Sequence, residues 1–154
     1  MKNFEVLYAR AMQIASFAHA GQTDKGGNPY IEHPIAVAEQ LKEDELKVVA
    51  ILHDVLEDSD MTAEDLLKSG FPCEIIEAVQ VLTYKKTDSG TYEEYIARVA
   101  KNRMAKAVKI SDIRHNMDLS RIPNPGTRDL KRCEKYKRAL TYLENDGEDS
   151  PQGK

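Results

Sequence analysis

An amphipathic run at positions 48–58 is the feature that most constrains the fold. Its apolar residues recur at helical spacing and share one face: Val48, Ile51, Leu52, Val55 and Leu56. The other face carries His53 one turn before Glu57, and Asp54 one turn before Asp58. Three acids on a face without a lysine repel one another. This face is therefore either a solvated helix surface or a surface that holds a cation.

Helical periodicity recurs along the chain, and segments rich in Gly and Pro separate the periodic runs. We expect helices over residues 4–20, 34–41, 43–58, 62–68, 73–83, 92–99, 105–117 and 130–143. The sequence contains no alternating strand pattern and no internal repeat. It therefore predicts an all-α fold, a single compact multi-helix bundle. The folded domain is expected to cover residues 1–144, and residues 145–154 are expected to form a disordered tail.

Length and composition indicate one globular domain. A chain of 154 residues has no room for a second catalytic domain. No segment approaches the roughly 18 apolar residues of a membrane span, and the start of the chain lacks the apolar region of a signal peptide. We therefore expect a cytoplasmic protein without a membrane partner, in which Cys73 and Cys133 are reduced thiols.

Charge is distributed unevenly along the chain. The net charge of −4 argues against general nucleic-acid binding. Segment 43–65 is strongly acidic, whereas Lys and Arg crowd the C-terminal third. An acidic, metal-binding half beside a basic half would suit a small polyanionic substrate, whose phosphates the metal and the cations would share. For residues 128–138 alone, an amphipathic helix with solvated charges is the better explanation.

Candidate metal ligands come from three separate predicted helices. They are His33 before Pro34, the adjacent pair His53 and Asp54, and Asp112. Two imidazoles and two carboxylates suit Mn²⁺ or Fe²⁺, although Ni²⁺ and Zn²⁺ also accept these ligands. Because no thiolate belongs to the set, a structural zinc site is disfavoured. The acidic pair one turn further on, Glu57 and Asp58, would reach a water bound to that metal.

Four segments, taken in order, resemble a known family. They are 19–22 (HAGQ), 29–34 (PYIEHP), 52–58 (LHDVLED) and 109–117 (KISDIRHNM). Together they are similar to the hydrolase domain of RelA/SpoT proteins and to the stand-alone small alarmone hydrolases, which are all-helical HD-domain phosphohydrolases. The resemblance extends from residue 4 to residue 143. It implies a 3′-pyrophosphohydrolase that removes pyrophosphate from guanosine tetra- or pentaphosphate, (p)ppGpp, without any synthetase domain.

The resemblance also implies a role for each matched position. The expected Mn²⁺ ligands are His33, His53, Asp54 and Asp112. Glu57 and Asp58 match the acidic pair that activates or orients the attacking water. Lys25 and Asn116 match substrate-contacting positions, and Tyr30 lies beside them in the matching loop. Lys109, a cation that shares a helix face with Asp112 and Asn116, is also expected to contact the substrate.

One position departs from the family pattern. Asp24 stands where the alarmone hydrolases typically have an arginine that stacks on guanine, and an acid supplies neither the cation nor the planar group. This departure leaves a second hypothesis open, an HD phosphohydrolase that acts on a deoxynucleotide or on the 2′-phosphate of NADPH. A third hypothesis is a catalytically silent HD domain that binds nucleotide or metal. In each case we expect a small-molecule nucleotide as partner, and several apolar helices are compatible with a homodimer.

Overall fold

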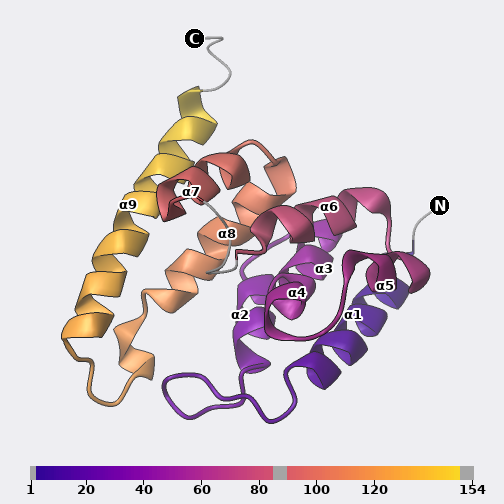
Figure 1. The fold of residues 1–154 in the computed structure, drawn as a ribbon, viewed down its shortest axis with the longest axis horizontal. Helices are drawn as coiled ribbons and strands as arrows, with labels where there is room; N and C mark the ends of the chain where they lie inside the picture. Colours follow the sequence, from indigo (N-terminus) through magenta and orange to yellow (C-terminus); the bar gives the residue numbers. More distant parts are fainter. Residues whose placement is uncertain (1–2, 85–89, 150–154) are drawn as a thin grey trace.

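The computed structural model describes residues 3–84 and 90–149, which fold into an assembly of helices. The elements are α1 (Phe4–Ala18), α2 (Glu32–Glu39), α3 (Asp44–Leu52), α4 (Val55–Asp58), α5 (Ala63–Lys68), α6 (Cys73–Leu82), α7 (Tyr92–Ala100), α8 (Arg103–Asn116), the 3-10 helix η1 (Leu119–Arg121) and α9 (Thr127–Asp149). Figure 1 shows their arrangement, with α9 along one side of the bundle and α1 on the other. Within 3–84 and 90–149, no strand forms beyond one isolated bridge between Thr23 and Pro29. The predicted all-α class is confirmed.

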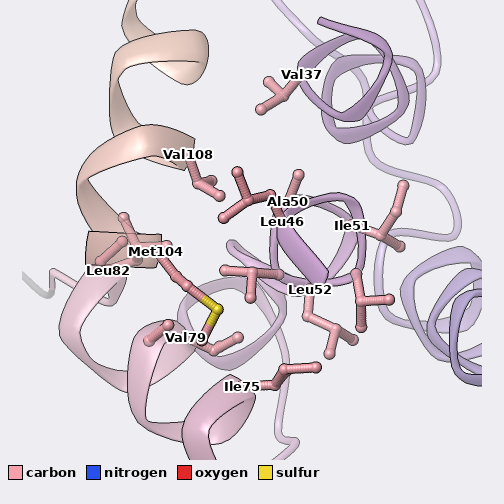
Figure 2. Packing of buried hydrophobic residues seen from close by; sticks show 14 of the residues in the cluster. Val37, Leu46, Ala50, Ile51, Leu52, Ile75, Val79, Leu82, Met104 and Val108 are labelled. Atoms are coloured by element: carbon pink, nitrogen blue, oxygen red, sulfur yellow. The ribbon is translucent and has the colours of Figure 1, made fainter. Parts of the chain in front are cut away.

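Helix α3 is the centre of the core. It packs against α1, α2, α6 and α8, and its buried residues are Leu46, Val48, Val49, Ala50, Ile51 and Leu52. Figure 2 shows its side chains surrounded by apolar groups of α2, α6 and α8. Because α2 and α8 are the helices that carry His33 and Asp112, this packing brings the predicted ligands toward the end of α3.

Local capping sets the start of several helices. Thr62 accepts a hydrogen bond from the backbone N–H of Asp65, whose carboxylate accepts one from the N–H of Thr62, which is a capping box. Thr91 and Glu94 form the same arrangement at the start of α7. Asn102 caps α8 by accepting from the N–H of Ala105. The Asn102 cap sets the residue at which α8 begins, and Asp112 lies on this helix.

The single helix expected over residues 43–58 is wrong. The chain forms α3, a turn at His53 and Asp54, and then the short helix α4. The carbonyl of Ala50 accepts from the N–H of His53 at 3.3 Å and from the His53 Nδ1 at 2.6 Å, instead of from the N–H four residues on. His53 is buried, and because α3 ends at Leu52 and α4 begins at Val55, His53 and Glu57 do not lie on one continuous helix.

The cysteines, the C-terminal segment and the segment around residues 85–89 are also subjects of sequence expectations. Cys73 and Cys133 are free thiols, as expected. Helix α9 continues through residues 145–149, the first half of the segment expected to be a tail, and residues 150–154 lie outside the described residues. Most of the segment between the helices expected over 73–83 and 92–99 also lies outside them, at 85–89. The domain boundary at 144, the homodimer and the cytoplasmic location stay predictions. None of the described helices has the length and apolar character needed to cross a membrane.

Replacing Leu52 by Ala tests whether α3 is the centre of the core. Leu52 is fully buried, so the Leu52→Ala protein is expected to lose about 2–5 kcal/mol of unfolding free energy in urea denaturation, because the cavity is lined by side chains of several helices. Leu67→Ala makes the same chemical change at a side chain that is 55% exposed and should cost less than about 0.5 kcal/mol. Equal losses in the two variants would contradict the placement of the core.

Candidate metal and active site

His53 presents one ring nitrogen to the centre of the site. Its Nδ1 lies 2.6 Å from the carbonyl oxygen of Ala50, and a carbonyl only accepts, so Nδ1 carries the proton. The other nitrogen, Nε2, is buried and has no hydrogen-bond partner among the described residues. It lies 3.1 Å from Oδ2 of Asp54 and 3.5 Å from Oδ1 of Asp112. Two carboxylates facing Nε2 favour a positive charge at this point, either a proton on Nε2 or a metal cation bound to it.

His33 faces the same point from α2. Its Nε2 lies 2.7 Å from Oδ1 of Asp112, and the side chain is almost completely buried. Its Nδ1 lies 2.7 Å from Nδ1 of His115, and the two rings stack with centroids 4.9 Å apart. If Nε2 ligates a metal, Nδ1 holds the proton and donates it to His115. His115 then fixes which nitrogen of His33 is available.

The sequence reasoning missed His115. Burial lowers the pKa of His115 to about 4, and His33 and Arg121 add to this effect, so the ring is neutral and accepts a hydrogen bond. A signal for it was present. His115 follows Asp112 by three positions and therefore lies on the same face of α8.

Asp112 is a buried anion held by several donors. Nζ of Lys109 lies 3.0 Å from Oδ2, and Nδ2 of Asn116 donates to Oδ1 at 3.0 Å. Burial alone would raise the pKa of Asp112, but Lys109 and the imidazoles of His53 and His33 hold it well below its ordinary value. These neighbours therefore favour the ionised form of Asp112.

His33, His53 and Asp112 could hold a divalent metal ion. One ligand atom from each lies within 4.8 Å of the others, and all three residues are buried. The unpaired Nε2 of His53 and the low pKa of Asp112 both fit a cation at this point. Although burial opposes a charge on His53, Asp54 and Asp112 raise the pKa of His53 well above its ordinary value. The same two carboxylates would stabilise a metal dication in place of the proton.

Asp54, the fourth predicted ligand, lies beside this group. Its Oδ2 accepts a hydrogen bond from the Tyr30 hydroxyl at 2.5 Å. Burial would raise the pKa of Asp54, but His53 outweighs this effect and holds it at about 2. Asp54 is therefore an anion within reach of His53, and its role as a direct ligand stays a prediction.

The acidic pair Glu57 and Asp58 lies on α4, directly after the turn that carries His53. The backbone N–H of Tyr84 donates to Oε1 of Glu57 at 3.0 Å. Both side chains reach solvent, yet partial desolvation by the surrounding protein raises the pKa of Glu57 to about 6, helped by Asp54 and Asp58. The pKa of Asp58 is raised for the same reasons. A carboxylate whose pKa lies near 6 can accept a proton at neutral pH and pass it on.

A pocket of about 270 Å³ adjoins the cluster. It is lined by Thr23, Asp24, Lys25, Gly26, Tyr30, Asn116, Arg121, Ile122, Arg132 and Tyr136. Three predicted substrate contacts, Lys25, Tyr30 and Asn116, lie on its wall. The fourth, Lys109, is not among the lining residues, because its ammonium group is directed at Asp112 and lies 5.3 Å from the ring centre of Tyr95.

The chain is 33% identical over 120 residues to the bifunctional (p)ppGpp synthase/hydrolase SpoT of Escherichia coli K12, across 70% of this chain and 17% of that protein. It is 34% identical over 113 residues to guanosine-3′,5′-bis(diphosphate) 3′-pyrophosphohydrolase of Aquifex aeolicus, across 67% of this chain and 16% of that one. No family model matches the chain.

The chain is a homologue of the SpoT/RelA (p)ppGpp pyrophosphohydrolases. It spans about a sixth of the length of these bacterial relatives (17% and 16%). A metazoan ortholog of SpoT, reported to hydrolyse ppGpp, has the same fold with a TM-score of 0.72, at 24% identity over 91% of this chain and 84% of that one. The predicted resemblance to the RelA/SpoT hydrolases and the predicted all-helical bundle are thus confirmed.

Removing the His115 imidazole tests its role in this SpoT/RelA-type site. In isothermal titration with Mn²⁺, His115→Ala is expected to weaken metal affinity roughly 10- to 100-fold, because His33 loses the acceptor that fixes its tautomer. His53→Ala should abolish binding. Arg114→Ala, next to His115 but on the exposed side of α8 where Arg114 pairs with Glu144, should leave the affinity unchanged. Wild-type affinity in His115→Ala would show that the His33 tautomer does not depend on this contact.

Proposed function

We propose that this protein is a Mn²⁺-dependent 3′-pyrophosphohydrolase of (p)ppGpp. One observation carries the proposal: two buried imidazoles and a buried carboxylate converge on a point beside a solvent-reachable acidic pair, in a homologue of guanosine-3′,5′-bis(diphosphate) 3′-pyrophosphohydrolases. The mixed imidazole and carboxylate set suits Mn²⁺, which is also the metal that the family resemblance implies. His33, His53 and Asp112 would hold the ion, with Asp54 as a fourth ligand.

In this proposal, separate residues of the chain hold the metal, accept the proton of the water and orient the water. A bound divalent ion would lower the pKa of a coordinated water and offset phosphate charge. Glu57, raised to a pKa of about 6, is suited to accept the proton of that water. Asp58, whose pKa is also raised, would orient it. Tyr30 holds Asp54 through its hydroxyl, and Lys109 and Asn116 hold Asp112, so both carboxylates keep fixed directions.

The reaction balances with water as the only co-reactant. Hydrolysis breaks the bond between the 3′-oxygen and phosphorus. The water oxygen stays on the released pyrophosphate, and a proton completes the 3′-hydroxyl of GDP or GTP. The pocket beside the cluster, with Lys25 and Arg132 on its wall, would receive the rest of the nucleotide.

Pyrophosphate release from ppGpp is the direct test. The wild-type protein with Mn²⁺ is expected to convert ppGpp to GDP and pyrophosphate, and Glu57→Gln is expected to lower kcat roughly 10²- to 10⁴-fold, because the glutamine amide cannot accept the proton. Glu64→Gln, an equal change at a glutamate of α5 that is 75% exposed, should retain full activity.

Three results would contradict the proposal in different ways. Absence of pyrophosphate at any enzyme concentration, with metal and nucleotide bound, would indicate a silent binding module. Faster turnover of NADPH or of a deoxynucleotide would move the assignment to another substrate of the same metal site. Full activity in Glu57→Gln would remove Glu57 from the proton-transfer step.

The pH profile gives a separate test of Glu57. Because its pKa is raised to about 6, the glutamate is protonated, and unable to accept a proton, over a wider acid range than an ordinary carboxyl. The kcat for ppGpp at saturating Mn²⁺ is therefore expected to fall as pH drops through about 6, approaching tenfold per pH unit below it. A flat profile from pH 7 down to pH 5 would contradict the assignment of Glu57 as the base.

A further inference from the structure

Arg121 brings a guanidinium group to the pocket beside the metal cluster. It is the last residue of η1 and lines the pocket together with the loop that contains Asp24. Its Nη1 donates to Oδ2 of Asp24 at 3.3 Å, across 97 positions of sequence. The pocket therefore has an arginine on the wall formed by the Asp24 loop, although position 24 itself is an acid.

Asp24 is held rigidly enough to orient that arginine. Its Oδ1 accepts from the backbone N–H groups of Gly26 and Asn28, both at 2.9 Å, so its other oxygen, Oδ2, is the one directed at Arg121. The loop also touches η1 through its backbone. A Cβ added at Gly26 would lie 2.3 Å from the carbonyl oxygen of Arg121, so only glycine permits this approach. Loop and η1 form one unit.

The polar edges of the guanidinium are directed into the protein. Nη1 meets Asp24, and Nη2 donates to the carbonyl oxygen of His115 at 3.3 Å. Nε is buried, and within the described part of the chain it has no hydrogen-bond partner. Yet the side chain is 26% exposed and lines the pocket. Because Nη1 and Nη2 are engaged and the charge is paired with Asp24, an aromatic base in the pocket would use the face of the guanidinium rather than these donors.

The pocket adjoins the metal cluster at one wall. At its inner wall, Tyr30 bonds Asp54 and Asn116 bonds Asp112, so this end adjoins the metal cluster. Arg121 lies on the wall built by η1 and the Asp24 loop. A nucleotide whose reacting phosphate lies at the cluster and whose remainder fills this pocket would therefore have Arg121 beside it on one wall.

We infer that Arg121, oriented by Asp24, is the residue on which the base of the nucleotide stacks. The inference deepens the proposed function and rests on it for the choice of nucleotide. The planar cation that the family pattern leads one to expect at position 24 is then supplied from position 121, and Asp24 positions it. Stacking of an arginine plane on an aromatic base is a recognised source of affinity that depends on planarity as well as on charge.

The test compares a ligand that has a base with one that lacks it. Binding of GDP and of inorganic pyrophosphate is measured by isothermal titration in the presence of Mn²⁺. Arg121→Lys keeps the charge but loses the plane, and is expected to weaken GDP binding roughly 10-fold while pyrophosphate binding stays unchanged. Arg114→Lys is the matched control, an arginine of α8 also paired with a carboxylate but outside the pocket, and should bind both ligands like the wild type.

Asp24→Asn tests the positioning role. It is expected to weaken GDP binding less than Arg121→Lys does, because the guanidinium remains but loses its oriented partner. The double variant should bind GDP no more weakly than Arg121→Lys alone, since the two residues act through one contact. Unfolding temperature and Mn²⁺ affinity confirm that each variant is folded, and Arg121→Gln replaces Arg121→Lys if the lysine variant does not fold.

Three outcomes would overturn the inference. They are GDP binding by Arg121→Lys equal to the wild type, an equal loss of GDP and pyrophosphate binding, and absence of GDP binding by the wild type. ppGpp turnover is scored separately. If wild-type turnover is present while Arg121→Lys is unaffected, this inference fails and the proposed function stands. If GDP binding depends on Arg121 but turnover is absent, the proposed function fails and this inference stands.

Discussion

The buried negative charge of Asp112 is the constraint around which the site is arranged. An unpaired carboxylate in a protein interior is strongly unfavourable, so the fold must surround it with donors and positive charge. Lys109 and Asn116 come from its own helix, whereas His33 comes from α2 and His53 from the turn after α3. The helices that meet here are the same ones that pack around α3, so the apolar core and the polar centre position each other.

The break between α3 and α4 follows from the same constraint. His53 follows α3 on the same face as the fully buried Val49 and Ala50, so its ring lies against the core. By bonding the Ala50 carbonyl through Nδ1, the imidazole ends the helix, becomes buried and directs Nε2 at the carboxylates. This side-chain hydrogen bond thus fixes which nitrogen of His53 is available.

The sequence predicts the helices and three residues that the structure brings together, His33, His53 and Asp112, and what it does not predict has physical causes. Apolar periodicity identified the buried face of α3, because burial of Ile51 and Leu52 depends on local spacing. It missed the turn at His53, since helical spacing does not register a side chain that competes for a backbone carbonyl. His115 was missed because its role requires contact with His33, 82 positions earlier. Arg121 stayed hidden for the same reason: only the folded chain places it against Asp24.

The long sequence separations across the site affect how it responds to partial unfolding. His33 meets Asp112 across 79 positions, and Asp24 meets Arg121 across 97. Neither the N-terminal nor the C-terminal half contains a complete cluster or a complete pocket. Detachment of either half would therefore separate the metal ligands and the two sides of the pocket at the same time. The site belongs to the cooperative folding unit of the whole domain rather than to a loop that opens alone. Ligand binding at this site would accordingly protect amide hydrogens in both halves of the chain from exchange.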